Sequence, residues 1–227
     1  MTEGRKTMDI LHLDNRIVVC LKPVGVVSTD EPGGLPDRLR EELGGGEVCI
    51  RTVHRLDQPV GGVMVLARSR EAARRLSDQM SGGGFHKEYL AVVHGEMGED
   101  EGRFCDLLCH SKEERKTYIT QTPGKDAREA RLSYRVLARR EGMSLVSVEL
   151  ETGRTHQIRA QFSGHGFPLV GDKKYGAPEA EMEGIALWSH RLEFLHPQTE
   201  EPVSVRAFPP ARYPWNLFGE FLGETDR

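Results

Sequence analysis

One stretch of the chain places a carboxylate where it could do chemistry. The stretch TVHRLDQPVGG, residues 52–62, sets Asp57 after His54 and Arg55 and before a Pro and Gly turn. A carboxylate can act as a nucleophile or as a general base. An Asp at a turn is also a common cap for backbone N–H groups. The stretch by itself therefore leaves a catalytic and a structural role open.

A second stretch, CDLLCH, brings Cys105, Cys109 and His110 close together in sequence. Zinc sites use these residue types, but no second Cys or His pair stands at zinc-site spacing. The chain has four cysteines at irregular spacing and is too long to need disulfides for its stability. We therefore expect reduced thiols and no metal.

Size and composition predict a globular protein with a real core. The chain has 227 residues, of which 37% are hydrophobic. No apolar run approaches the roughly 20 residues of a membrane helix, and the first 16 residues lack the apolar segment of a secretory signal. We expect a cytoplasmic protein that does not bind membranes.

The charge is unevenly distributed along the chain. The net charge is −4, yet residues 112–140 hold nine basic and four acidic side chains, and residues 177–227 hold nine acidic and four basic ones. A local basic surface can bind a polyanion even on an acidic protein. A merely solvated surface is the alternative.

Short strands with few helices are expected to position these residues. Residues 16–28 and 61–69 read as buried strands, and residues 87–95 alternate as a third strand. Residues 69–80 predict a helix with Ser69 as its N-cap, ended by glycines. Residues 130–140 and 143–152 predict a hairpin around Glu141 and Gly142.

The rest of the chain adds one short helix and two strands. Residues 155–166 predict a helix with a Thr N-cap and a Gly stop, and the stretches IALWSHRLEFLHP and EPVSVRAFPP predict two strands. The connections are mostly too short for parallel crossovers. We therefore predict an α+β fold with a largely antiparallel mixed sheet and flanking helices.

Several motifs in order resemble the RluA-type pseudouridine synthases. They are HRLD followed by GGVMVLARS, then KEYLAVVHG, GRTHQIRAQFSGHGFPLVGDKKYG and LWSHRLEFLHP, and the resemblance runs from about Leu21 to Pro210. It implies the pseudouridine synthase fold with a central RNA-binding cleft. It also implies an isomerase that turns uridine into pseudouridine in rRNA or tRNA, without a cofactor or metal.

The resemblance implies that three residues take part in the isomerisation of uridine. Asp57 corresponds to the catalytic Asp of HRLD. Arg159, the last residue of GRTHQIR, corresponds to the Arg that pairs with that Asp, and it would keep a desolvated carboxylate ionised. Tyr89 corresponds to the aromatic residue that stacks on the target base. Their ordinary interpretations are a turn Asp, a surface ion pair and a core Tyr.

Four further residues are expected at the RNA. Ile158 would form an apolar wall against the uracil, and Lys87 would contact phosphate or support the strand. Arg55 would fill the space that a flipped base leaves, because a guanidinium can both stack and bind phosphate. His54 could assist, although a structural, hydrogen-bonded histidine is an equal alternative.

The sequence departs from many relatives at two places. Pro59, Val60 and Gly61 stand where relatives have Thr and Ser before the Gly. The region before Leu21 is too short for a separate RNA-binding domain, so we expect one catalytic domain over residues 1–227, active as a monomer. The glycine-rich residues 32–46 are expected to form a mobile loop at the RNA or a surface excursion.

Other functional classes remain as alternatives. A catalytically silent RNA-binding relative that assists RNA folding is the first of them. A small-molecule hydrolase using Asp57 and His156 is less well supported, because the chain has no nucleophile elbow or metal-ligand pair. A protein kinase is excluded, since HRLD occurs without a DFG motif or a Gly-rich phosphate loop. We expect no binding to DNA.

Overall fold

The computed structural model describes residues 8–45 and 47–222, which form two compact units. Unit 1 comprises Met1–His86 and Ser189–Ala207, and unit 2 comprises Lys87–Trp188 and Phe208–Arg227. The chain therefore leaves unit 1 after His86, returns to it for Ser189–Ala207, and then passes back to unit 2. That the two units act together as one catalytic domain stays a prediction.

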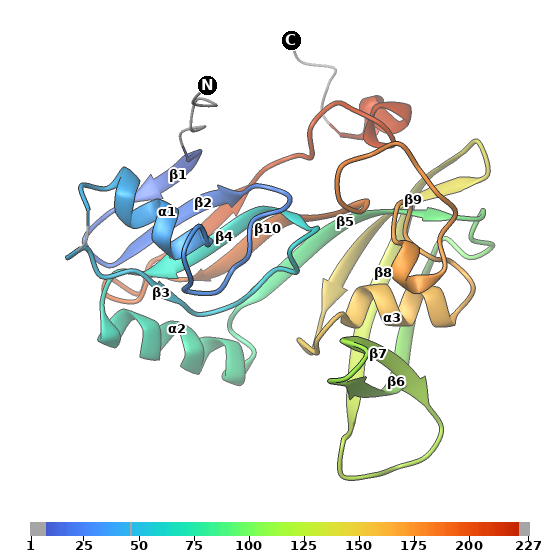
Figure 1. Cartoon of the computed structure of the whole chain (residues 1–227), viewed down its shortest axis with the longest axis horizontal. Helices are drawn as coiled ribbons and strands as arrows, with labels where there is room; N and C mark the ends of the chain where they lie inside the picture. Colours follow the sequence, from blue (N-terminus) through green and yellow to red (C-terminus); the bar gives the residue numbers. More distant parts are fainter. Residues whose placement is uncertain (1–7, 46, 223–227) are drawn as a thin grey trace. The chain divides into compact units, whose positions relative to one another are not determined.

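Unit 1 is a sheet with two helices (Figure 1). Its strands follow the order β1-β2-β4-β10, with β11 on β10 and β3 on β4, and β2 runs antiparallel to both β1 and β4. The elements are β1 (Ile10–Leu13), β2 (Ile17–Lys22), α1 (Leu35–Glu42), β3 (Arg51–Thr52), β4 (Gly61–Ala67), α2 (Arg70–Gly82), β10 (Leu187–Leu195, which enters unit 1 at Ser189) and β11 (Pro202–Arg206).

Helix α2 confirms the predicted helix and covers one face of this sheet. The Ser69 side chain accepts a hydrogen bond from Ala72 N, and Gly83 ends the helix in the left-handed conformation. Ala72 and Leu76 pack with alternate residues of the strands, and the cluster is Ile17, Val19, Val63, Val65, Ala67, Ala72, Leu76, Phe85, Leu192 and Phe194. The period-2 pattern of β2 and β4 thus supplies the core of unit 1.

Gly62 at the start of β4 allows two chain segments to approach closely. A Cβ there would lie 2.3 Å from the carbonyl oxygen of Ser189, and its φ is +121°. The Ser189 hydroxyl donates to Val63 O at 2.9 Å. A side chain at position 62 would therefore displace the backbone of β10.

The predicted loop over residues 32–46 is wrong in its middle, where the chain forms α1. Pro36 stands in the first turn of this helix, and Leu35 and Leu39 are fully buried. Proline fits the first turn because the N–H it lacks has no partner there. The apolar spacing, rather than the flanking glycines, decides the structure; Gly46 lies outside the described residues.

Unit 2 is an antiparallel sheet with the order β5-β9-β8-β6-β7. Figure 1 shows α3 lying against the part of this sheet that contains β6, β7 and β8. The elements are β5 (His86–His94, in unit 2 from Lys87), β6 (Glu101–Ser111), β7 (Lys116–Thr120), β8 (Ala127–Arg140), β9 (Met143–Leu150), α3 (Gln157–Gly164) and the 3₁₀ turns η1 (Lys173–Tyr175) and η2 (Trp215–Phe221). Mostly antiparallel strands with few helices confirm the predicted α+β fold.

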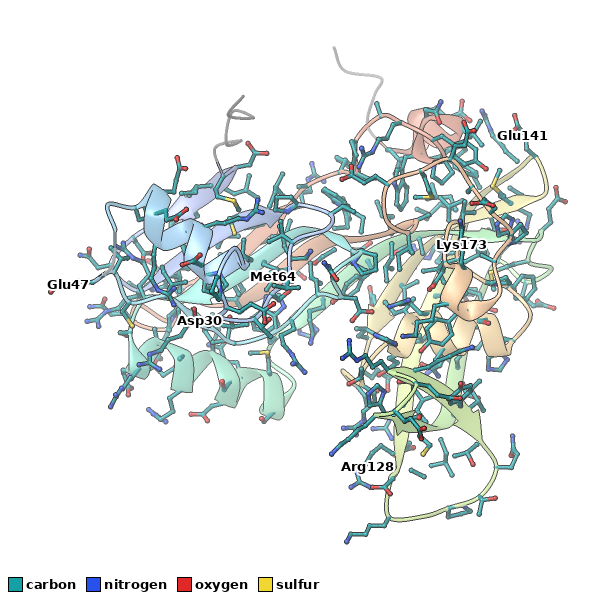
Figure 2. The ribbon with its side chains drawn as sticks, in the orientation of Figure 1. Asp30, Glu47, Met64, Arg128, Glu141 and Lys173 are labelled. Atoms are coloured by element: carbon teal, nitrogen blue, oxygen red, sulfur yellow. The ribbon has the colours of Figure 1, made fainter. Side chains whose placement is uncertain are left out.

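The β8–β9 hairpin confirms the predicted turn. Glu141 and Gly142 have φ of 53° and 71°, as a two-residue type I′ turn requires. Figure 2 shows Glu141 at the tip of this hairpin and Arg128 near the other end of β8.

Helix α3 begins later than predicted. Its N-cap is His156, with φ of 53° and no capping side-chain bond, whereas Thr155 lies before the cap and its carbonyl accepts from Thr117 Oγ1 at 2.8 Å. The contact with β7 therefore overrides the local capping preference of Thr155. The predicted Gly stop is confirmed, since Gly166 follows the helix with φ of 89°.

No helix in the part of the chain that the structure describes combines the length and the apolar character needed to span a bilayer.

Candidate active site

The loop that carries Asp57 is fixed on both sides of this residue. Asp57 is half-buried between β3 and β4. Before it, the Ser28 hydroxyl donates a hydrogen bond to Leu56 O at 2.8 Å, and Leu56 N donates one to Ser28 Oγ at 3.1 Å. After it, Gly25 N donates to Gln58 O at 2.9 Å, and the Gln58 side chain donates to Gly25 O at 3.0 Å. The backbone of Asp57 is thus held in one conformation.

A buried lysine lies beneath the same loop. The Lys22 side chain is fully buried, and its Nζ donates to the carbonyls of Pro23, Val26 and Gln58 at 2.9, 2.6 and 3.3 Å. Burial lowers the pKa of Lys22 to about 8, and the charge of Asp57 acts in the opposite direction. Lys22 therefore joins the loop to the end of β2 and interacts electrostatically with the Asp57 carboxylate.

The two cationic neighbours in HRLD differ in environment. His54 is buried, its Nε2 accepts a hydrogen bond from Val65 N at 3.2 Å, and its ring lies 5.7 Å from that of Phe85. Arg55 is exposed. The bond from β4 supports the structural interpretation of His54, while the expected RNA contacts of both residues stay predictions.

Arg159 on α3 is held by a bidentate ion pair in unit 2. Its Nε donates to Asp172 Oδ2 at 2.7 Å and its Nη2 to Asp172 Oδ1 at 2.9 Å, and both side chains are buried. The guanidinium carbon lies 5.0 Å from the centre of the Tyr175 ring. The arrangement fixes the plane of the guanidinium and compensates its charge.

The remaining predicted residues also lie in unit 2. Tyr89 is buried on β5 opposite Val148 of β9, and Ile158 is buried on α3. Lys87 precedes Tyr89 by two residues; burial lowers its pKa, and its Nζ lies 3.5 Å from where a Gly153 side chain would begin. Side chains alternate along a strand, so Lys87 and Tyr89 lie on the same face of β5.

The predicted residues thus form two groups. Asp57, His54 and Arg55 share the β3–β4 loop of unit 1, whereas Arg159, Ile158, Tyr89 and Lys87 lie in unit 2. The pairing of Asp57 with Arg159 stays a prediction.

Four residues that support these groups were not identified from the sequence: Lys22, Ser28, Asp172 and Tyr175. A lysine between an apolar strand and a proline was one available signal for Lys22. The charged and aromatic positions of GDKKYG were another, for Asp172 and Tyr175. Neither pattern indicates which residues these side chains contact.

The cysteines form no metal cluster within residues 8–45 and 47–222. Cys20 is buried, which raises the pKa of its thiol to about 12, and Cys49 and Cys105 are exposed. Cys109 is paired with Tyr118 in the strand register. Across those residues, no three His, Cys, Asp or Glu side chains are arranged to hold a metal ion.

Comparison with known proteins gives consistent matches. The family model described as RNA pseudouridylate synthase matches residues 16–164. The dual-specificity RNA pseudouridine synthase RluA of Pasteurella multocida is 34% identical over 215 residues, covering 90% of this chain and 94% of that protein. The ribosomal large subunit pseudouridine synthase D of Xanthomonas campestris is 33% identical over 222 residues, covering 88% of this chain and 65% of that protein.

A solved structure is also similar. The human RNA pseudouridylate synthase domain containing 1 has a TM-score of 0.77 and 25% sequence identity, and the match covers 91% of this chain and 85% of that one. By sequence and by fold, this chain belongs to the RNA pseudouridylate synthase family, whose members are isomerases.

Proposed function

We propose that this protein converts specific uridines of rRNA or tRNA to pseudouridine with Asp57 as the catalytic carboxylate. The bond between uracil N1 and ribose C1′ breaks, the base turns, and a bond from C5 to C1′ forms. The proton on C5 is lost to solvent and N1 gains one, so the reaction needs no oxidant, reductant or cofactor.

The observation that carries this proposal is the environment of Asp57. Hydrogen bonds hold the residues on both sides of it, and the buried Lys22 ammonium interacts with its charge. A turn aspartate that only caps backbone groups needs no buried cation nearby, because burying an ammonium is unfavourable. The arrangement suits a carboxylate that must stay ionised and correctly oriented in a closed RNA complex.

The roles of the unit 2 residues belong to the same proposal. Arg159 pairs with Asp57 in the active enzyme, Tyr89 stacks on the target uracil, and Ile158 forms an apolar wall beside it. The bidentate bond to Asp172 is compatible with this role for Arg159, because it engages two of the five guanidinium N–H groups. Lys87 contacts a phosphate of the target strand.

Basic residues at one end of unit 2 support an RNA substrate. Arg131, Arg139 and Arg140 form ion pairs with acidic side chains. Four exposed residues in the β6–β7 and β7–β8 connections and at the start of β8 form no ion pair with any described residue; they are Lys112, Arg115, Lys125 and Arg128. Figure 2 shows Arg128 at that end of the unit. Unpaired surface cations of this kind bind phosphates.

The printed names of the relatives support the substrate class. One is a dual-specificity RNA pseudouridine synthase and another a ribosomal large subunit pseudouridine synthase. We propose rRNA or tRNA for this chain on that basis, with Arg55 and His54 next to the space left by the flipped base. We also propose that it acts as a monomer in the cytoplasm.

A catalytically silent RNA-binding protein is the second candidate. Its RNA contacts would need the basic end of unit 2 but not an ionised carboxylate, which repels phosphate. The retained Asp57 and the buried Lys22 favour the enzyme.

Release of tritium from C5 of uridine tests the proposal. Total rRNA and tRNA transcribed with [5-³H]uridine are incubated with the protein, with Asp57→Asn and with Asp100→Asn, which removes an exposed aspartate paired with Arg139. We expect the wild type and Asp100→Asn to release tritium, and Asp57→Asn to bind RNA without releasing it. Equal release by Asp57→Asn would overturn the role of Asp57. Binding by the wild type without release from either RNA pool would favour the silent protein.

A further inference from the structure

We propose that Asp172 is a positioning residue that sets the orientation of the Arg159 guanidinium for its partner carboxylate. The inference rests on the proposed function and extends it, because it assigns a role to a residue outside the HRLD, KEY and GRTHQIR motifs.

The geometry of the pair restricts rotation of the guanidinium. The bonds at 2.7 and 2.9 Å run from Nε and Nη2 to the two different oxygens of one carboxylate, so the two groups lie edge to edge. The exposed fraction is 6% for the Arg159 side chain and 1% for that of Asp172. One edge of the guanidinium is therefore occupied, and the N–H groups that Asp172 does not engage are directed elsewhere.

Tyr175 fixes the face of the guanidinium. Its ring centre lies 5.0 Å from the guanidinium carbon, and its hydroxyl accepts a hydrogen bond from Thr117 N at 2.8 Å. The same hydroxyl lies 3.0 Å from His156 Nδ1. β7 and the start of α3 thus hold the ring, and the ring and Asp172 together constrain both the plane and the edge of Arg159.

A short turn presents both of these side chains. Asp172 is the N-cap residue of η1, and its carbonyl accepts from Tyr175 N at 2.9 Å and from Ala177 N at 3.2 Å. Gly171 before it has φ of 81°, and a Cβ there would lie 2.7 Å from Met182 Sδ. The sequence GDKKYG thus forms a rigid turn that places the acid and the aromatic ring on the same guanidinium.

The orientation of the Arg159 guanidinium matters because, in the proposed function, Arg159 also holds the carboxylate of Asp57. Without Asp172, the buried guanidinium would lose one compensating charge and could rotate toward other acceptors. Small displacements of catalytic groups reduce rates by about 10²-fold. We therefore expect Asp172→Asn to lower the single-turnover rate constant by about 10- to 100-fold, with little change in RNA affinity.

The control for this variant is a second aspartate that contacts α3 from another element. Asp106 on β6 accepts from Gln161 Nε2 at 2.7 Å and lies 3.1 Å from His165 Nε2, so it also supports α3 without contacting Arg159. Asp106→Asn should lower the unfolding temperature and leave the rate constant close to that of the wild type. A loss of rate specific to Asp172→Asn thus separates positioning from general destabilisation.

Chemical rescue of a variant at Arg159 tests the same role independently. In Arg159→Gly, guanidinium ion at millimolar concentration should bind between Asp172 and Tyr175 and restore part of the activity. Methylammonium ion, a point charge, should restore less, because it cannot form two parallel bonds. Adding Asp172→Asn to Arg159→Gly should remove the advantage of guanidinium.

The outcomes separate this inference from the function on which it rests. An active wild type with full activity in Asp172→Asn, or equal rescue by the two cations, would overturn the role of Asp172 alone. A wild type that releases no tritium from rRNA or tRNA would overturn the proposed function, and the inference with it.

Discussion

Ser28 Oγ donates a hydrogen bond to Leu56 O and accepts one from Leu56 N, so one hydroxyl satisfies both backbone groups of the residue before Asp57. Ser28 and Leu56 are both buried. Because both residues are buried, the orientation of Asp57 depends on a side chain 29 positions earlier.

Ser28→Ala should therefore reduce both stability and activity. Leaving a buried N–H and C=O without their partner costs about 1–3 kcal/mol each, so the free energy of unfolding should fall by at least about 2 kcal/mol. Urea unfolding and tritium release measure the two effects. Ser81→Ala, which removes an exposed hydroxyl bonded to Ser77 O, is the control and should be nearly neutral. A Ser28→Ala variant with the stability and activity of the wild type would contradict this role of the Ser28 hydroxyl.

Lys22 should give the activity an alkaline limb. Because its pKa is about 8, the ammonium loses its proton as the pH rises through that value, and the positive charge beside Asp57 disappears. Single-turnover rates between pH 6 and about 10 should fall above about pH 8. In Lys22→Met the rate should be low at every pH and show no such limb. A limb unchanged in this variant would belong to another group.

The same lysine should make the folded protein more stable as the pH rises, whereas the activity falls. Its pKa is lower in the folded protein than the ordinary value of 10.5, so the unfolded chain binds more protons between about pH 8 and 10.5. Its contribution to the free energy of unfolding therefore rises with pH across that window, by on the order of 3 kcal/mol in total. Urea titrations of the wild type and Lys22→Met at several pH values should differ by this slope.

Removing basic residues from one end of unit 2 should weaken RNA binding in a salt-dependent way. For the double variant Lys125→Ala/Arg128→Ala, the slope of log K against log salt should become shallower by about 1.4 to 1.8, since each phosphate contact contributes about 0.7 to 0.9. Filter binding at four salt concentrations measures it. The control is Arg74→Ala on α2, whose guanidinium is paired with Glu71 and Asp78. An equal change in the control would exclude a specific role for the basic end.

Gly62→Ala should destabilise unit 1 strongly. Its Cβ would overlap the Ser189 backbone, and the φ of +121° is unfavourable for alanine. We expect a loss of at least about 2 kcal/mol in the free energy of unfolding, because neither strand can move without breaking sheet bonds. Gly98→Ala, where the new Cβ meets nothing within 4 Å, should change stability by less than about 0.5 kcal/mol. Similar effects at both positions would contradict this account.

Patterns with a single physical cause were predicted well from the sequence. The helix after Ser69 and the Glu141-Gly142 turn were confirmed, because a capping serine and two positive φ angles are local requirements. The strand β6 was not predicted. Its burial alternates poorly, with charged and apolar residues mixed along it, and its conformation depends on pairing with β7 and β8.

The sequence by itself determined the family, the α+β class and the identity of the candidate residues Asp57, Tyr89 and Arg159, because these depend on motifs and periodicities within short segments. Only the tertiary structure decided which side chains support them. Lys22 donates a hydrogen bond to Gln58 O in the Asp57 loop, and Asp172 accepts one from Arg159; both contacts join separate segments of the chain. Such contacts depend on how strands and turns pack, which no local pattern specifies.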